Sequence, residues 1–322
     1  MIDVVRHRIL AVILAHVFAL TACTTSAPLA SAAPAAATDI APGGSPSELV
    51  FDFGSLWVGL ADKGAIARID PVSGMVTKAV TVGDPGRILR QARLAHGVPN
   101  AVASGFDSIW AVGADGKLAR IDPATNEVTT FDVGIVGGAL ATGEGAVWIT
   151  SYDDGAVVRF DPTARVVTNT FTGLGGLFGV AAAFGSVWVV SKTGHEVLRL
   201  DPTSGVVTAR IGAERNPDWV TVGAGSVWVT REDPRGVLRI DPSSNTVVAT
   251  IPGAPSWGIG TGIAFYDGAV WTGFLVRIDP SAEKVAASFA GKGEQVAVTF
   301  GGGSAWVADV LVVHQVPLVL IR

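Results

Sequence analysis

Several residue types that support common functions are scarce in this chain. Cys23 is the only cysteine among 322 residues. One cysteine cannot form a disulfide within the chain, and no thiol nucleophile follows position 23. Lysine and arginine form no run, and the formal net charge is −5. A protein that tracks a phosphate backbone needs a basic stripe, so we predict no nucleic-acid partner.

Common signatures of catalysis are missing as well. The sequence contains no Gly-x-Ser-x-Gly elbow and no pair of metal ligands at helical spacing. It carries no mark of a quinone-cofactor dehydrogenase beyond repeated tryptophan. We therefore assign no catalytic residue, no metal ligand and no resident cofactor from the residues alone.

The N-terminal segment has no apolar run long enough to cross a bilayer. Arg6 and Arg8 precede a mostly apolar stretch from Ile9 to Leu20. A spanning helix needs about 20 residues, whereas a shorter run behind a basic segment is typical of a signal peptide. We therefore expect the protein to be exported.

The signal segment ends in a lipidation motif. Leu20-Thr21-Ala22-Cys23 resembles the lipobox of bacterial lipoprotein precursors, in which cleavage precedes the cysteine and its sulfur is lipidated. This predicts a lipoprotein signal peptide at 1–22, a flexible tether at 23–37 and a lipid anchor at Cys23, on the extracytoplasmic side of the cell membrane or envelope. The alternative is ordinary cleavage after Ala30-Ser31-Ala32.

Glycine and tryptophan, by contrast, recur at regular positions. Seven copies of Gly-x-x-Trp or a close variant are followed in six units by Arg-x-Asp-Pro. In the fifth unit, apolar and polar residues alternate at 219–222, 226–230, 236–240 and 246–251, which predicts four strands, here lettered A to D in chain order within each unit. Four strands in about 40 residues match one propeller blade. The seven tryptophans are Trp57, Trp110, Trp148, Trp188, Trp228, Trp271 and Trp306.

The repeat predicts an all-β fold, a seven-bladed β-propeller of four-stranded antiparallel blades over 38–322. We call the arginine and aspartate of each Arg-x-Asp-Pro motif its landmark residues. We expect the seven tryptophans to fill the gaps between blades and the landmark arginines to stack or pair locally. The last unit lacks Arg-x-Asp-Pro, and residues 38–41 look like a strand without a blade. We therefore expect the N-terminal strand to complete the last blade, which removes an exposed edge. The rival is that Leu318 to Arg322 supplies this strand.

The turn after each Asp-Pro has its own pattern. Asp followed by Pro favours a type I turn. Four residues after the Asp, most units carry Gly or Asn, which tolerate positive φ. Arg165 and Glu283 stand there in two units, so we expect those two turns to differ.

These motifs resemble a known group of propellers. Trp228-Val229-Thr230, followed by Gly-Val-Leu-Arg-Ile-Asp-Pro, is similar to the YVTN-type propellers and to the wider set that includes virginiamycin B lyase. The resemblance covers roughly 38–322 and implies the propeller fold. It is weak for function, because the motif residues are structural and one fold hosts many activities.

Ligand contacts are expected in the loops that vary. In propellers the D-to-A and B-to-C loops share the face called the top, while the A-to-B and C-to-D turns lie on the bottom. Repeated positions are fixed by blade packing, so only the top loops are free to carry specificity. We expect a binding or scaffold module for an envelope protein or a small ligand. Its candidate residues are Arg90 in an insertion at 84–97, Tyr152, Asp154, His195, Glu196, Glu214, Arg215, Arg231 and Trp257.

A lyase is the alternative function. The resemblance to virginiamycin B lyase implies opening of a cyclic depsipeptide lactone by elimination, with a histidine base and a magnesium ion held by acidic residues. His195 and Glu196 are adjacent, so on an extended segment they point apart. Magnesium is expected only under this alternative. The neighbouring Arg231-Glu232-Asp233 run is expected to be a solvated charge cluster.

Overall fold

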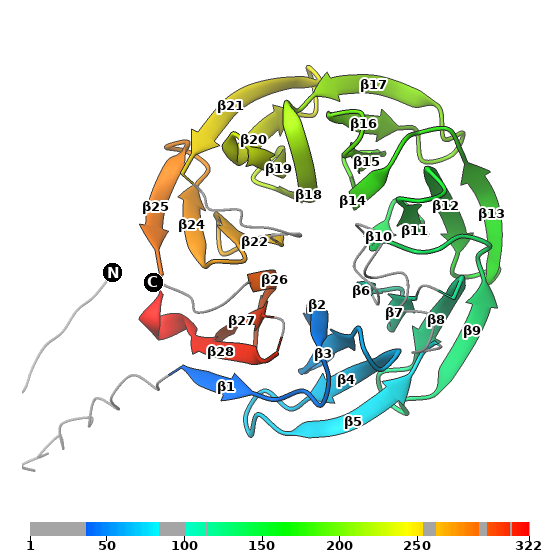
Figure 1. The fold of residues 1–322 in the computed structure, drawn as a ribbon, viewed down its shortest axis with the longest axis vertical. Coiled ribbons are helices and arrows are strands. Elements are labelled where there is room, and N and C mark those ends of the chain that lie inside the picture. The colour runs from blue at the N-terminus through cyan, green and yellow to red at the C-terminus, as the bar shows by residue number, and fades with distance from the viewer. Residues whose placement is uncertain are drawn as a thin grey trace, which may run out of the picture. The chain divides into compact units, whose positions relative to one another are not determined.

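The described part of the chain folds into a ring of seven blades. The computed structural model describes residues 37–83, 101–113, 115–253, 262–289, 295–309 and 311–321. Their strands form seven sheets, each four-stranded and antiparallel (Figure 1). The first strand of each blade lies nearest the ring axis and the last at the rim. The predicted seven-bladed propeller is confirmed.

The blades follow one another in chain order. Blade 1 consists of β2 (Pro46–Asp52), β3 (Ser55–Leu60), β4 (Ala65–Ile69) and β5 (Val76–Thr81). Blade 2 consists of β6 (Ala101–Gly105), β7 (Ser108–Val112), β8 (Lys117–Ile121) and β9 (Val128–Asp132). Blade 3 consists of β10 (Ala139–Gly143), β11 (Ala146–Ser151), β12 (Ala156–Asp161) and β13 (Val166–Phe171). Blade 4 consists of β14 (Leu177–Ala183), β15 (Ser186–Ser191), β16 (Glu196–Leu200) and β17 (Val207–Gly212). Blade 5 consists of β18 (Arg215–Gly223), β19 (Ser226–Asp233), β20 (Arg235–Asp241) and β21 (Thr246–Pro252). Blade 6 consists of β22 (Ile263–Tyr266), β23 (Ala269–Thr272), β24 (Val276–Asp279) and β25 (Lys284–Ser288). Blade 7 consists of β26 (Gln295–Gly301), β27 (Ser304–Asp309), β28 (Val313–Pro317) and β1 (Thr38–Ile40).

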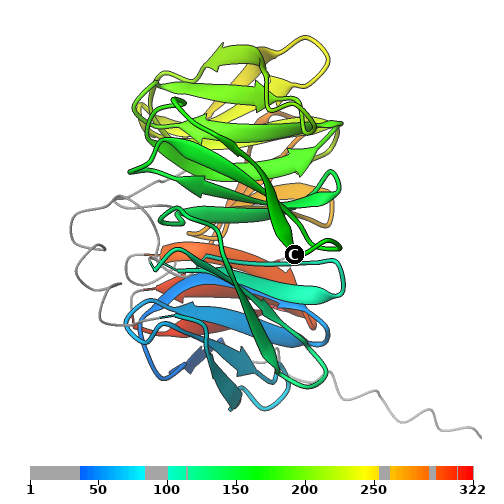
Figure 2. The same ribbon diagram turned by 90° about the vertical axis from the view of Figure 1, so that its right-hand side faces the viewer.

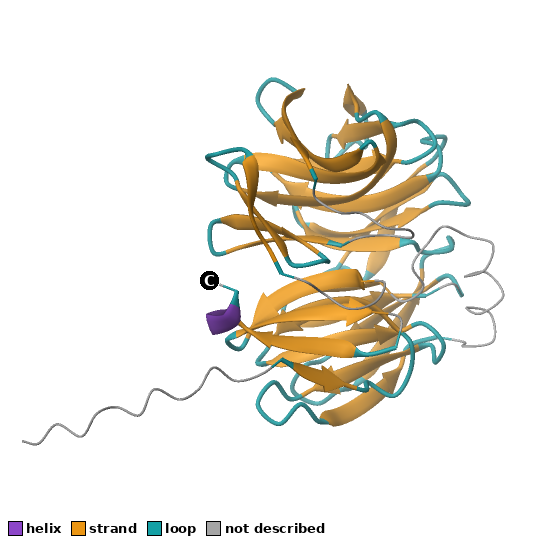
Figure 3. Ribbon diagram, turned by 60° about the vertical axis from the view of Figure 1, so that its left-hand side comes forward, coloured by secondary structure: helices purple, strands orange, loops and turns teal. Residues whose placement is uncertain are grey.

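Connections between strands lie on two opposite faces of the ring. Seen from the side, the strands run between the faces and the loops gather at each (Figure 2). Strands dominate the described residues, and the short 3-10 helix η1 (Leu318–Leu320) follows β28 near the C-terminal end (Figure 3). The face with the B-to-C and D-to-A connections is called the top below.

The seven repeated tryptophans are structural. Each indole is buried, with at most 4 % of its surface exposed. Each Nε1 donates a hydrogen bond to the backbone carbonyl five residues earlier, as Trp188 does to Ala183 and Trp228 to Gly223. The guanidiniums of five landmark arginines lie over the indoles of their own blades at 4.8–5.9 Å. Since the polar atom of every ring is satisfied inside its blade, we assign the seven rings first to the packing of the blades.

The N-terminal strand closes the ring. Strand β1 pairs antiparallel with β28, with Asp39 opposite His314 and Ile40 opposite Val313. Ile40 is buried in the core shared by blades 1 and 7. His314 Nδ1 lies 2.7 Å from Asp39 Oδ1, and its Nε2 lies 3.1 Å from Asp309 Oδ2. The expected closure is confirmed, and the rival is wrong, because the residues after Pro317 turn into η1.

The C-to-D turns share one backbone geometry. Arg165 and Glu283 adopt φ of 61° and 52°, close to the 63° of Asn126 and the 57° of Asn245. The expectation that these two turns differ is therefore wrong. Each landmark aspartate accepts backbone hydrogen bonds from the turn, as Asp161 does from Thr163 and Ala164, and these bonds hold the turn in shape even where a β-carbon makes positive φ less favourable.

Candidate functional site

The top loops of blades 4 and 5 bring three charged side chains together. Lys192 follows β15, Asp218 lies on the innermost strand β18, and Glu232 lies near the end of β19. Lys192 Nζ lies 2.5 Å from Asp218 Oδ1 and 3.5 Å from Glu232 Oε1. The same ammonium lies 4.8 Å from the centre of the Phe178 ring. We call these residues the Lys192–Asp218–Glu232 triad.

Asp218 is the buried member of the triad. Its side chain has no exposed surface, whereas Lys192 and Glu232 keep 15 % and 24 % of theirs. Burial raises the pKa of Asp218 to about 7, against the attraction of the Lys192 ammonium, while Glu232 adds to the rise. Asp218 Oδ2 is buried and has no hydrogen-bond partner within the described part of the chain. Lys192 and Glu232 therefore form the solvent-facing side of the triad.

Arg231 and Glu214 form a second charged contact at the same place. The Arg231 guanidinium pairs with the Glu214 carboxylate, which precedes β18. Only 4 % of the Arg231 side chain is exposed, against 56 % for Glu214. The expectation of a solvated charge cluster is therefore wrong for Arg231. Its neighbour Asp233, at 58 % exposure, does face solvent.

His195, Glu196 and Arg215 lie nearby but do not converge. His195 is exposed in a turn at φ 53°, and its Nδ1 accepts a hydrogen bond from the Asn216 amide at 3.4 Å. Glu196 begins β16 and pairs with Arg210 at 2.5 Å. Arg215 is 77 % exposed and lies 3.7 Å from Asp233. The expectation that His195 and Glu196 point apart is consistent with these separate partners.

Tyr152 and Asp154 belong to the adjoining top loop of blade 3. Asp154 accepts hydrogen bonds from the Ser151 hydroxyl at 2.7 Å and from the Val136 amide at 3.1 Å, so it shapes the turn. The Tyr152 ring meets Phe178 edge-on at 6.3 Å, and Phe178 meets Trp219 at 5.9 Å. This aromatic chain links blades 3, 4 and 5 at their inner edge.

Three of the sequence candidates lie outside the described residues. They are Arg90 with the insertion at 84–97, Trp257, and the lipidation candidate Cys23. They remain predictions.

Glu48 and Trp219 are two further polar residues on innermost strands, and neither was among the candidate site residues. Glu48 on β2 is half-buried, yet its Oε2 atom is fully buried and has no hydrogen-bond partner among the described residues. Burial raises the pKa of Glu48 to about 8. The buried Trp219 Nε1 on β18 also lacks a partner within the described ranges. Buried polar atoms left unpaired need an explanation, such as a ligand or an ordered water.

The sequence contained a signal for both residues. Glu48 and Trp219 each stand nine residues before the repeated tryptophan of their unit. The other five units carry alanine or glycine at that position. A carboxylate or an indole at a position otherwise kept small indicates a role other than blade packing.

The raised pKa values predict a pH-dependent stability. A carboxyl whose pKa is raised on folding favours the native state fully at low pH, and this contribution is lost as pH rises through the folded pKa. For Glu48 the loss therefore falls between about pH 4.5 and 8. We expect Glu48→Gln to raise the free energy of unfolding by about 2 kcal/mol at pH 9 and to change it little at pH 4, as measured by urea denaturation. The exposed carboxylate variant Glu127→Gln serves as control, and equal effects of both variants at pH 9 would contradict the assignment.

The described residues carry neither a metal-binding cluster nor a membrane-spanning helix. They contain no group of three or more His, Cys, Asp or Glu side chains placed to hold a metal ion. The same residues include no helix of the length and apolarity needed to cross a membrane.

Comparisons with known proteins establish the fold. No family model matches the chain, and no curated protein matches it. Among solved structures, the crystal structure of the computationally designed Ika8 protein is similar, with a TM-score of 0.61 and 13 % identity. The match covers 86 % of this chain and 98 % of that one. At this identity the likeness shows the architecture alone.

Proposed function

We propose that the protein is a binding module whose top face at blades 4 and 5 captures a ligand or a partner segment. The observation that supports this most strongly is Asp218, a fully buried carboxylate with one oxygen unpaired among the described residues. Blade packing does not need a charge there, since the equivalent residue of blade 4 is Phe178. Burying a charge is costly unless it is paired and hydrogen-bonded, and Lys192 pairs with only one of the two Asp218 oxygens.

The chemistry of the site favours a ligand with hydrogen-bond donors. The triad opposes two carboxylates to one ammonium, and Asp218 Oδ2 is an acceptor when the group is ionised. Because Asp218 is fully buried, the carboxylate that an amine or amide N–H of a ligand would meet is that of Glu232, which keeps 24 % of its surface exposed. Glu214, Arg215 and His195 are exposed in top loops of the same two blades and would form the polar rim of the contact.

We place this module outside the cytoplasmic membrane, anchored by lipid at Cys23. The basic segment, the short apolar run and the lipobox support this location. The propeller fold is compatible with such a role, and YVTN-type propellers are the family whose motifs the repeat resembles.

The anchor predicts a labelling result. Cys23→Ala should leave the precursor uncut at that position and abolish incorporation of a fatty-acid probe, because the thiol is the atom modified. The measurement is gel mobility with probe fluorescence in producing cells. Equal labelling of wild type and variant would rule out the anchor, and a mature soluble form starting near Ala33 would favour ordinary cleavage.

Capture from a solubilised envelope fraction tests the binding face. Glu232→Gln should reduce the amount of partner retained by about ten-fold, since a charge-assisted hydrogen bond contributes about 1.5–3 kcal/mol. Arg215→Ala should reduce it less, because its side chain is largely exposed. The matched control is Arg165→Ala, which removes an exposed arginine from a bottom turn. Loss of capture in the control with retention in Glu232→Gln would show that the face is wrong.

The lyase alternative has a distinct readout. Magnesium-dependent opening of a cyclic depsipeptide lactone, lost in His195→Ala, would replace the binding function with catalysis. Nothing in the geometry of His195 favours this, since its Nδ1 is engaged by the Asn216 amide.

A further inference from the structure

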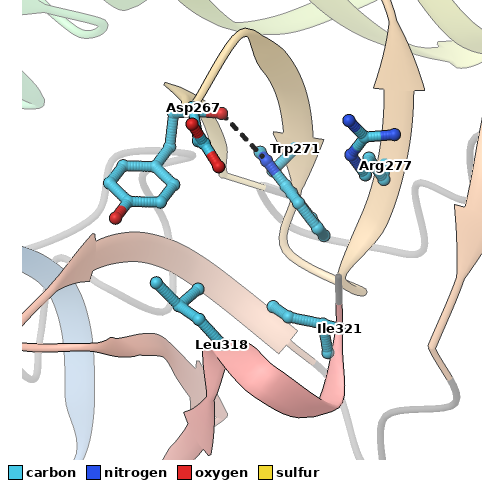
Figure 4. A pocket seen from close by; sticks show the side chains of 6 residues that line it. Asp267, Trp271, Arg277, Leu318 and Ile321 are labelled. Atoms are coloured by element: carbon cyan, nitrogen blue, oxygen red, sulfur yellow. Dashed lines mark hydrogen bonds between the residues drawn. The ribbon is translucent and has the colours of Figure 1, made fainter.

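A pocket of about 320 Å³ lies between blades 6 and 7, on the side of the A-to-B turns (Figure 4). Blade 6 contributes the turn residues Tyr266 and Asp267, together with Trp271 and Arg277. The segment after β28 contributes Leu318 and Ile321. The pocket is therefore remote in sequence from the triad and opens beside the bottom turns, where no function has been assigned above.

Arginines equivalent to Arg277 have fixed partners in other blades. The first is a serine of the neighbouring B strand, as where Arg199 Nε donates to Ser186 Oγ at 2.8 Å. The second, made within the described residues by three of the five equivalent arginines, is the C-to-D turn of the next blade. Arg199 Nη1 reaches Pro242 O and Asn245 Oδ1 at 2.7 and 2.8 Å. Arg68 and Arg239 make the same pair of contacts to Asn126 and Glu283 and to the prolines of those turns.

Arg277 has lost each of these acceptors. The serine of its B strand is replaced by Ala269. Arg159, whose B strand also begins with alanine, donates instead to Thr168, nine residues later, at 2.8 Å. The residue nine positions after Arg277 is Ala286, whose side chain has no acceptor. The next blade has no continuous C-to-D turn, because its outer strand β1 comes from the other end of the chain. In the described part of the protein, no hydrogen bond or ion pair to the Arg277 guanidinium is found.

We propose that this pocket binds an apolar monocarboxylate. A guanidinium presents paired N–H donors that match a carboxylate in bidentate geometry. Tyr266, Trp271, Leu318 and Ile321 form walls for an apolar body, and the volume falls in the lower range of ligand sites. Asp267 also lines the pocket, and its negative charge disfavours ligands with a second anionic group.

The side chains in Figure 4 fit this assignment. Arg277 and Asp267 lie on opposite sides of the Trp271 ring, while Leu318 and Ile321 face that ring from the segment after β28. Trp271 Nε1 is already used by Tyr266 O at 3.3 Å, so the indole offers its apolar surface. The guanidinium is then the polar group that orients the ligand.

Isothermal titration of the mature protein with 3-phenylpropionate tests the site, with 3-phenylpropionamide as the neutral control ligand. We expect the acid to bind and the amide to bind at least about ten-fold more weakly. Arg277→Gln should lower affinity for the acid by the same factor, whereas Arg159→Gln, which alters an equivalent arginine outside the pocket, should leave it unchanged.

A second variant covers a failure of Arg277→Gln to fold. Ala269→Ser restores the serine that engages the arginine in other blades. It should weaken binding of the acid while the melting temperature holds or rises. The proposal is overturned if the acid fails to bind, if acid and amide bind equally, or if neither variant changes the affinity. These outcomes leave the top-face function untouched, because no triad residue is altered.

Discussion

Replacing Trp188 by alanine is expected to lower the free energy of unfolding by about 3–5 kcal/mol. The indole is fully buried and its Nε1 donates to Ala183 O at 3.2 Å. The substitution removes the apolar surface, leaves a cavity between blades, and leaves the carbonyl of Ala183 without its donor. Urea denaturation monitored by circular dichroism gives the free energy directly.

The matched control lies on the same hairpin. Phe184 is an aromatic residue in the A-to-B turn of blade 4 and keeps 43 % of its surface exposed. Phe184→Ala should change the free energy of unfolding by less than about 1 kcal/mol. If the two variants cost the same, the tryptophan is not the interblade packing residue described here.

Deletion of residues 37–41 is expected to cost at least about 3 kcal/mol, because burial of Ile40 alone is in the range of 2–5 kcal/mol. The deletion also removes the pairing of β1 with β28 and the contact of Asp39 with His314. The exposed edge of β28 would then be free to pair with other chains. Thermal unfolding and sedimentation measure both consequences.

A deletion of residues 24–36 is the control for this experiment, because it shortens the chain but keeps β1. It should leave the melting temperature unchanged. An equal melting temperature for both deletions would show that β1 does not contribute to closure. Aggregation confined to the 37–41 deletion would support the exposed-edge explanation.

The fold could be read from the sequence because it depends on repeated local features. The period of the tryptophans fixed the number of blades, and the alternation within one unit gave four strands close to their observed bounds. Ring closure by the N-terminal strand could be predicted because the last unit lacks Arg-x-Asp-Pro, while residues 38–41 look like a strand without a blade. Two turns were expected to differ on the basis of Arg165 and Glu283, but hydrogen bonds to the landmark aspartates override the local preference.

The candidate site could be read only in part. Variable top loops were predicted to carry the contacts, with candidates from Arg90 to Trp257 spread over several blades. Asp218 was not among them, because its burial depends on the packing of a neighbouring blade. Arg231 was expected to be solvated, since three adjacent charges usually are, whereas its guanidinium is enclosed and paired with Glu214. Contacts between blades are set by the curvature of the ring, and a single repeat does not encode them.

The same limit applies to the bottom pocket. The alanines at 269 and 286 stand in the sequence, but they matter only beside Arg277. The missing third partner results from the way the two ends of the chain share blade 7. The second site is therefore recognised by Arg277, which lacks the contacts that equivalent arginines make in other blades. The first is recognised by Asp218, a buried charge on an innermost strand.

Amide hydrogen exchange of the captured complex is the most direct test of the central claim, that the top face of blades 4 and 5 is the binding surface. The protein would be compared alone and bound to the partner retained from the envelope fraction. We expect slower exchange at residues 192–196 and 214–218 and unchanged exchange at the bottom turns 201–206 and 241–246. Protection of those bottom turns with no change at the top loops would contradict it.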